Sequence, residues 1–306
     1  MQRSTPDVAP SRPRTRKHAA DVSTDTFNGI LSILGQEPHD AAVLEAAAHF
    51  APHGDEWRAL LPVPLPEHVP CPWGESPVRA LAMDHLARRG DAEAHLESLR
   101  RSLARLHAKA ACERADCTER QLVDSVLRLA RGAGCVVTGV PLEAAPMRPV
   151  ATRWFSHLLV RSGRPTLVLP RGATLARRPR RVLVAWSDTP ESARALHEAL
   201  RWLPSGCALR IVTVAGAGQA RAVYESTTGA SALAGHLASH DIMATFDVLD
   251  GQGRPPEDVL LDEARTTSAD LIVMGCYGHS RTAEYVFGGV TRALLHRSRV
   301  PLLMAH

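Results

Sequence analysis

The amino-acid sequence predicts an α/β fold of two tandem doubly wound domains, each a mostly parallel five-stranded sheet with helices on both faces. Short apolar runs alternate with segments of helical periodicity, which is typical of parallel strands covered on both sides. Sequence segments also repeat at a constant offset, which indicates two similar halves. The 306 residues are 45% hydrophobic, which is enough to build two cores of ordinary size.

The repeated segments define the two halves. The segments that recur at an offset of 136 residues are Val136–Gly139 with Ile272–Gly275, and Arg164–Leu169 with Val300–Ala305. Near the start of each half, Ile30–Pro38 resembles Val182–Pro190 at an offset of 152. The first half therefore carries about 16 extra residues before Gly139, and we expect them as a loop near the prolines of residues 62–77.

The second half shows the alternation of elements most clearly. Its apolar runs predict strands at Arg181–Trp186, Ala208–Ala215, Ala244–Leu249, Asp270–Met274 and Val300–Ala305. Its helical periodicity predicts helices that begin at Pro190 and that span Tyr224–Ser239, Asp258–Thr267 and Val290–Arg297. Asp188 or Thr189 is expected to cap the first helix, with Pro190 at its first position.

A glycine-rich segment follows the fourth predicted strand of this half. Gly275 ends the strand, Gly278 follows three residues later, and Gly288-Gly289 opens the last helix. Glycine lacks the Cβ that would keep a ligand away from the backbone. The free N–H groups and dipole of a helix N-terminus attract anions. Because ligands of such sheets bind beyond the carboxyl ends of strands, this segment predicts a phosphate site.

Two side chains within this loop leave alternatives open. His279 either contacts a phosphate or lies at the solvated edge of the loop. Cys276 is either a redox-sensitive thiol or a small loop residue, and nothing else in the sequence supports the first interpretation. The partial dinucleotide fingerprint at Gly216–Arg221 favours a flexible loop, because Arg221 replaces its third glycine.

Composition and charge exclude several function classes. The formal net charge is only +4 and aromatic residues make up 4%, which argues against a nucleic-acid partner. No apolar run approaches the roughly 20 residues that a membrane span needs, and no export signal is evident, so we expect no membrane association and a cytoplasmic location. The six cysteines show no C-x-x-C pair and no zinc-like spacing. The arginine cluster at 171–181 indicates either a solvated linker or a phosphate or membrane patch.

The glycine spacing resembles that of the universal stress protein family, in its tandem form. Gly275, Gly278 and Gly288 match the family's nucleotide loop, G-x2-G-x9-G-[S/T], and Gly289 replaces its final Ser or Thr. The resemblance implies that the second half binds an adenine nucleotide, ATP, with or without Mg²⁺. The site residues that it implies are Ala185, Trp186, Ser187, Asp188, Val212, Met274, Gly275, Gly278, His279, Gly288, Gly289, Val290 and Thr291.

The family's ATP-binding members usually carry an acidic residue after the first strand, to bond the base or ribose. Ser187 occupies that position here, and Asp188 follows one residue later. Met274 and Val212 would border the adenine, and Ala185–Ser187 the nucleoside. Asp188 is also the candidate ligand for a magnesium ion on the nucleotide.

The first half departs from the family pattern. Leu142 stands opposite Gly278, and Thr152 and Arg153 stand opposite Gly288 and Gly289. We therefore expect the first half to keep the sheet and to bind no nucleotide. The resemblance further implies that the halves pair through their last strands, Thr166–Leu169 against Leu302–Ala305. The expected domains are a basic disordered tail (1–26), a degenerate first domain (27–172), a linker (173–180) and the nucleotide domain (181–306).

The expected function follows from the resemblance and from the absence of a catalytic motif in the sequence. There is no P-loop, G-x-S-x-G elbow or H-E-x-x-H sequence, so an efficient enzyme is not expected. The leading hypothesis is a stress-response sensor or regulator that binds ATP and acts on an unidentified protein partner, as a homodimer or alone. The alternatives are a nucleotide-free interaction module of the same fold and a slow ATP hydrolase.

Overall fold

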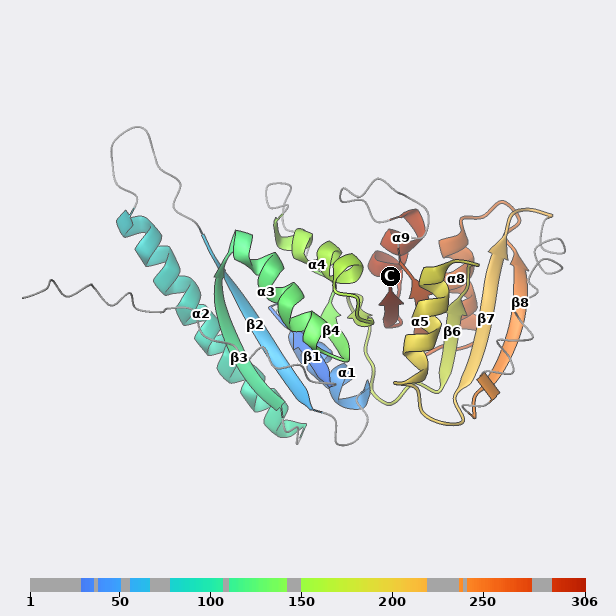
Figure 1. Cartoon of the computed structure of the whole chain (residues 1–306), viewed down its shortest axis with the longest axis horizontal. Coiled ribbons are helices and arrows are strands. Elements are labelled where there is room, and N and C mark those ends of the chain that lie inside the picture. The colour runs from blue at the N-terminus through green and yellow to red at the C-terminus, as the bar shows by residue number, and fades with distance from the viewer. Residues whose placement is uncertain are drawn as a thin grey trace, which may run out of the picture.

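The computed structural model describes residues 29–35, 38–50, 56–66, 78–106, 110–141, 150–218, 237–238, 241–276 and 288–306. Their strands form one ten-stranded sheet that runs across the molecule (Figure 1). Its order is β3 (Ala110–Thr118), β2 (Trp57–Leu65), β1 (Ile30–Ile33), β4 (Cys135–Gly139), β5 (Thr166–Leu169), β10 (Leu302–Ala305), β9 (Leu271–Gly275), β6 (Arg181–Ala185), β7 (Ala208–Ala215) and β8 (Met243–Asp250). Each half is a parallel five-stranded doubly wound sheet, which confirms the predicted fold class.

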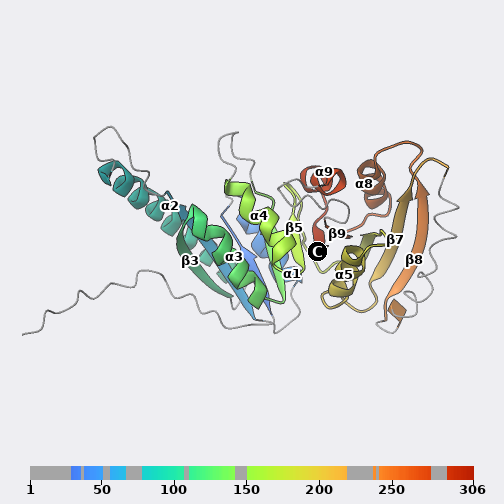
Figure 2. The ribbon, with the colours of Figure 1, turned by 45° about the horizontal axis from the view of Figure 1, so that its top comes forward.

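Helices cover both faces of the sheet, and each face has its own hydrophobic core. One core contains residues of α1 (Asp40–Phe50), α2 (Val78–Arg105) and α5 (Pro190–Leu200). The other contains residues of α3 (Glu119–Gly132), α4 (Val150–Arg161), α8 (Pro256–Thr266) and α9 (Gly289–Arg297). Both cores include residues of both halves, so the halves are joined through their interiors as well as through the sheet. Figure 2 shows α8 and α9 on one side of the strands of the second half and α5 on the other.

The halves meet at β5 and β10, which pair antiparallel. Leu302 lies opposite Val168, and Met304 lies opposite Thr166. This is the pairing expected between the last strands of the two halves, and it covers the edges that each sheet would otherwise expose. On one face, the rings of Phe50 and Trp202 stack at 5.7 Å, and both side chains are fully buried. These two residues are related by the same offset of 152 as the repeated sequence segments.

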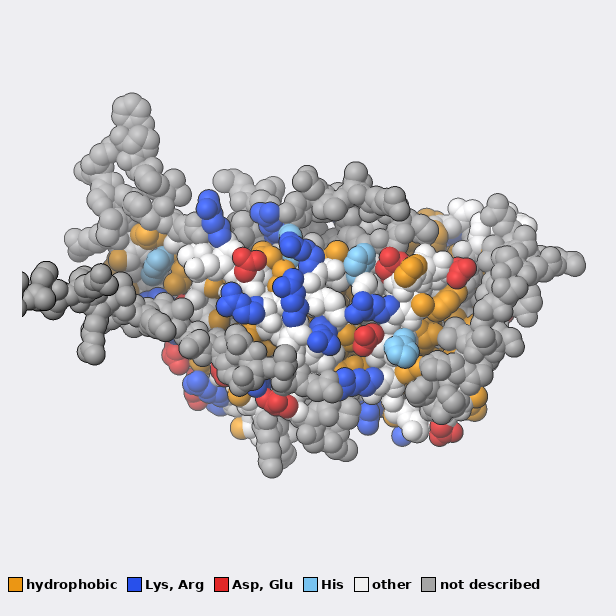
Figure 3. Space-filling view, in the orientation of Figure 1, with side chains coloured by type: hydrophobic (Ala, Val, Ile, Leu, Met, Phe, Trp, Pro, Cys, Tyr) orange, Lys and Arg blue, Asp and Glu red, His pale blue; other side chains and the backbone are white. Residues whose placement is uncertain are grey.

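Arg194 also connects the halves at the surface, and Arg164 makes a similar contact within the first half. Lys and Arg side chains gather on the face that carries α3, α4 and α5 in Figure 3. Within this region Arg194 of α5 donates to the Gly163 carbonyl at 2.9 Å, and Arg164 donates to the Arg131 carbonyl at 2.8 Å. These guanidinium groups therefore bind backbone carbonyls near the junction of the halves.

The extra residues of the first half do not lie where the prolines predicted. Pro62 and Pro64 belong to β2, so their assignment to a loop is wrong. The carbonyls of Glu56 and Leu60 accept hydrogen bonds from the N–H groups of Ile30 and of Leu34, just past β1. Because alternate residues of a parallel strand bond to the same neighbour, Pro62 and Pro64 also face the β1 side, but beyond the end of β1. Their missing N–H groups therefore break no β1–β2 bond. The extra length lies between β2 and β3, and its described part is the 28-residue helix α2.

Most expected boundaries of the second half agree with the structure within two or three residues. Thr189 caps α5, and Pro190 occupies its first turn. Of the helix expected at 224–239, only residues 237–238 are described, and they are helical. The segment expected as a strand at 300–305 forms β10 from Leu302 onward. Among the helices described, none combines the length and apolar character needed to cross a bilayer.

Candidate functional site

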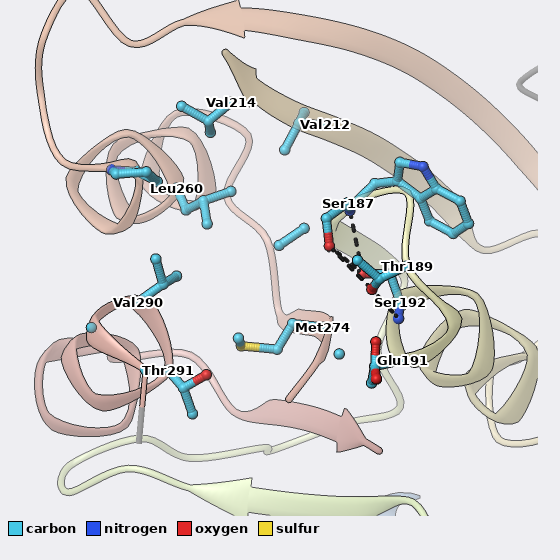
Figure 4. Close-up of a pocket in the computed structure, with 16 residues that line it drawn as sticks. Ser187, Thr189, Glu191, Ser192, Val212, Val214, Leu260, Met274, Val290 and Thr291 are labelled. Carbon is cyan, nitrogen blue, oxygen red and sulfur yellow. Dashed lines mark hydrogen bonds between the residues drawn. The ribbon is translucent and has the colours of Figure 1, made fainter. Parts of the chain in front are cut away.

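A cavity of about 480 Å³ lies at the carboxyl ends of β6, β7 and β9, beside the start of α9 (Figure 4). β6 pairs with β7 on one side and with β9 on the other, so successive connections diverge here. Ligands of doubly wound sheets bind at such a switch point. The lining residues are Ala185, Trp186, Ser187, Thr189, Glu191, Ser192, Val212, Val214, Pro256, Leu260, Met274, Gly275, Gly288, Gly289, Val290 and Thr291.

The cavity brings together most of the site residues that the sequence predicts. Those on its wall are Ala185, Trp186, Ser187, Val212, Met274, Gly275, Gly288, Gly289, Val290 and Thr291. Asp188 does not line the cavity and is exposed, because Thr189 caps α5 and the turn before the cap leaves Asp188 in solvent. Gly278 and His279 lie outside the described residues.

Three hydroxyl groups form the polar side of the cavity at the start of α5 (Figure 4). Ser187 Oγ lies 2.9 Å from Ser192 Oγ and 3.5 Å from Thr189 Oγ1. The Ser187 N–H donates to Ser192 Oγ at 3.2 Å, and the Ser192 N–H donates to Thr189 Oγ1 at 3.4 Å. The three hydroxyls are thus used by one another and by the turn that they stabilise.

The glycines at the two ends of the loop serve different purposes. A Cβ on Gly275 would lie 2.7 Å from the Glu191 carbonyl carbon and from the Ser192 nitrogen. Gly275 is therefore required by the close packing of α5 on β9. It also lines the cavity, and its expected place beside a phosphate stays a prediction. A Cβ on Gly288 or Gly289 would meet no described atom within 4 Å, so open space does adjoin this end of the loop.

The start of α9 provides the groups that an anion would bind. Gly288 is the N-cap and provides no side-chain hydrogen bond to the first turn. The first N–H groups of a helix have no partner within the helix, and its dipole adds partial positive charge. Because Gly288–Thr291 line the cavity, the uncapped turn opens directly onto it.

Apolar side chains form the rest of the wall. Val212 and Met274 come from the strands, at 1% and 5% exposed, and Leu260 comes from α8 at 4%. In Figure 4, Val214, Leu260 and Val290 lie on the opposite side of the cavity from Ser187 and Thr189. The cavity therefore has an apolar side, a hydroxyl side and a helix terminus, which together suit a ligand with an apolar ring, a polar middle and an anionic end.

Glu191 is a lining residue that the sequence analysis missed. It lies in the first turn of α5, and its Oε2 atom is buried with no hydrogen-bond partner in the structure. The family resemblance predicts an acidic residue directly after β6, whereas Glu191 reaches the cavity from the helix that follows. The missed lining residues are Thr189, Glu191, Ser192, Val214, Pro256 and Leu260. The signal that could have found Glu191 is its position in the first turn of α5, four residues before the buried Ala195 and therefore on the same face of the helix.

Cys276 is not a reactive thiolate. Its side chain is fully buried, and its Sγ lies 3.4 Å from the Ala305 carbonyl. Burial raises the pKa of this thiol to about 12, so it is protonated at neutral pH. The interpretation as a small packed residue therefore holds. Among the described residues, no group of three His, Cys, Asp or Glu side chains forms a potential metal site.

In the described part of the first half, two polar side chains occupy the corresponding place. His39 and Asp40 stand at the offset of 152 from Glu191 and Ser192. His39 Nε2 lies 3.1 Å from the Leu169 carbonyl, and its ring lies against Gly139, the counterpart of Gly275. Asp40 Oδ2 accepts from the Gly35 N–H at 2.7 Å and pairs with His95 of α2 at 2.8 Å.

Comparison with known proteins identifies the second half. Residues 179–306 match the family model described as "Universal stress protein family". A comparison with curated protein sequences gives no match.

Solved structures extend the likeness in fold to both halves. A universal stress protein from Archaeoglobus fulgidus superposes with a TM-score of 0.62 at 17% identity, covering 91% of this chain and 96% of that one. A putative universal stress protein from Pseudomonas aeruginosa gives 0.52 at 12% identity, covering 92% and 94%. At these identities the similarity shows the fold alone, and it extends over both halves.

Proposed function

Because residues 179–306 match the universal stress protein family model, we propose that this chain binds an adenine nucleotide, ATP, in the cavity of its second half. One observation carries the proposal: an apolar wall and an uncapped helix start line the same cavity. The apolar side chains suit the adenine ring, and the N–H groups of Gly288–Thr291 suit the phosphates. Glu191 is the one carboxylate among the described lining residues, so we expect any Mg²⁺ to be held mainly by the phosphates themselves.

The proposed role is that of a sensor or regulator in a stress response. Phosphoryl transfer needs metal ligands and a group that orients the nucleophile. Asp188, the residue on which the hydrolase hypothesis depended, is not part of the cavity wall. A protein that binds ATP without turning it over rapidly reports nucleotide level to a partner through a difference in affinity between two states.

Calorimetric titration with Mg·ATP tests the proposal. Gly289→Leu places a side chain in the open space beside the helix start and should reduce affinity by at least about tenfold, because the phosphates lose that space. Gly90→Leu is the matched control, since Gly90 is also an exposed helical glycine with no described atom within 4 Å of an added Cβ. Gly90→Leu should bind ATP as the unchanged protein does. Equal affinity in all three proteins would contradict the site.

The second candidate is a nucleotide-free interaction module of the same fold. Two observations favour it: Ser187 stands where the family usually has an acidic residue, and Gly289 stands where it has a hydroxyl. This candidate predicts no heat of binding with ATP and no small molecule released from the denatured, freshly purified protein. Mass spectrometry of the released fraction separates the two candidates.

A further inference from the structure

The Glu191 carboxylate is an acceptor without a partner inside the candidate site. Glu191 is among the residues that line the same cavity as the helix start, and its Oε2 atom is buried with no hydrogen-bond partner among the described residues. An unpaired buried polar atom is costly, and buried polar groups are nearly always hydrogen-bonded. The start of α5 packs closely on the end of β9 here, since a Cβ added to Gly275 would lie only 2.9 Å from the Glu191 Cβ. The carboxylate is therefore held where the cavity begins, next to the end of β9.

The described groups around the carboxylate do not provide the missing donor. The hydroxyls of Ser187, Thr189 and Ser192 bond to one another and to the turn. The described lining includes no Lys, Arg or His. With no donor among the described lining residues, an O–H or N–H group of a ligand is the partner that this carboxylate suits.

The polarity of the cavity decides which part of a nucleotide faces Glu191. The phosphates belong at the start of α9, because a carboxylate repels them and the helix terminus attracts them. The ring belongs against the apolar side chains, which Figure 4 shows on the far side of the cavity from the α5 residues. The sugar lies between ring and phosphates, and its 2′ and 3′ hydroxyls are donors that a single carboxylate can engage together.

We propose that Glu191 accepts hydrogen bonds from the ribose hydroxyls, so that the cavity selects ribonucleotides over their deoxy forms. This inference rests on the proposed function and assigns the sugar specificity of that site to a residue in the first turn of α5. In the first half His39 stands at the same place and bonds to the Leu169 carbonyl. At this position the first half therefore has a histidine bonded to a backbone carbonyl in place of a carboxylate.

A cycle of ligand and protein changes tests the inference. The unchanged protein should bind ATP about tenfold or more tightly than 2′,3′-dideoxyATP, the range expected for hydrogen bonds to a charged group. In Glu191→Ala the two ligands should bind equally. The ratio is the readout, because removing the carboxylate also removes its repulsion of the phosphates. Glu198→Ala is the control: it removes another α5 carboxylate, paired with Arg194 outside the cavity wall, and should keep the ratio.

Each result has a definite meaning. An unchanged ratio in Glu191→Ala, with both ligands still sensitive to Gly289→Leu, would overturn the ribose assignment and leave the nucleotide site in place. ITP lacks the exocyclic amine of ATP. If Glu191→Ala changes the ratio of the affinities for ATP and ITP but leaves the ratio for ATP and 2′,3′-dideoxyATP unchanged, the carboxylate binds the base and the ribose assignment is overturned. Failure of both ATP and 2′,3′-dideoxyATP to bind would overturn the proposed function and this inference together.

Discussion

The two halves share a backbone plan but treat its switch point in opposite ways. In each, the strand order is the same, and a glycine ends the fourth strand against the first helix. Gly35 N–H bonds to Asp40 in the first half, and Ser187 N–H bonds to Ser192 in the second, at equivalent positions. The loop after the first strand is therefore stabilised in the same way in both halves.

The difference lies in what the side chains do beyond this loop. In the first half, Asp40 also pairs with His95 of the long helix α2, and His39 bonds across to β5. In the second half, the hydroxyls bond locally, and Glu191 is left without a partner beside a cavity. A sheet can therefore be duplicated with its topology intact, while a few polar side chains decide whether its switch point is filled by protein or left open to a ligand.

The largest expected effect is at the contact that the two halves share. Trp202→Ala removes a fully buried ring that stacks on Phe50, and should lower the free energy of unfolding by about 3–5 kcal/mol. Phe50→Ala should cost a similar amount, and the double variant should cost less than the sum because the two rings share one contact. Urea unfolding followed by circular dichroism measures all three. Simple additivity would contradict a shared junction.

Next in size is the polar pair that closes the first half. Asp40→Ala leaves the Gly35 N–H and His95 without their carboxylate and should lower the free energy of unfolding by about 2–4 kcal/mol. Ser192→Ala removes only a hydroxyl at the equivalent place and should cost about 1 kcal/mol. Urea unfolding measures both losses. Equal losses of unfolding free energy for Asp40→Ala and Ser192→Ala would contradict the idea that the polar pair of the first half stabilises the fold more than the hydroxyl of the second.

Much of this comparison could be predicted from the sequence, because the repeats and strand periodicity are local patterns. Offsets of 136 and 152 residues place equivalent strands, and the paired last strands follow from the family resemblance. Glycine spacing and strand ends likewise lead to most of the cavity wall. The strand through Pro62 and Pro64 could not be predicted, since it depends on where the neighbouring strand β1 stops.

The remaining site residues depend on tertiary packing that no local pattern encodes. Val214 and Leu260 reach the cavity because β7 extends past β6 and α8 packs beside it. Glu191 reaches it because Gly275 lets α5 approach β9 closely. The same contact gives Gly275 a packing role that its sequence spacing does not reveal. What a glycine makes room for is decided by its neighbours in space.

A pair of glycine substitutions sharpens this point. Gly275→Ala would place its Cβ 2.7 Å from backbone atoms of α5, which cannot yield without moving the helix. Gly139→Ala would meet the His39 ring at 2.6 Å, which can rotate away. We expect a loss of about 1–3 kcal/mol for Gly275→Ala and a smaller loss for Gly139→Ala, measured by urea unfolding. A larger loss for Gly139→Ala would mean that the first half is the more tightly packed of the two.

The smallest expected effect is a pH dependence confined to the first half. Burial lowers the pKa of His95 below its ordinary value of 6.5, so near neutral pH its neutral ring donates to Asp40. Because the unfolded chain binds a proton at this histidine before the folded protein does, the free energy of unfolding falls as pH drops below about 7 and stops changing below the folded pKa. His95→Gln should remove this part of the slope. Hydrogen exchange, corrected for intrinsic rates, should show α1 and α2 opening as pH falls while α5 stays protected; equal opening of α5 would contradict the assignment.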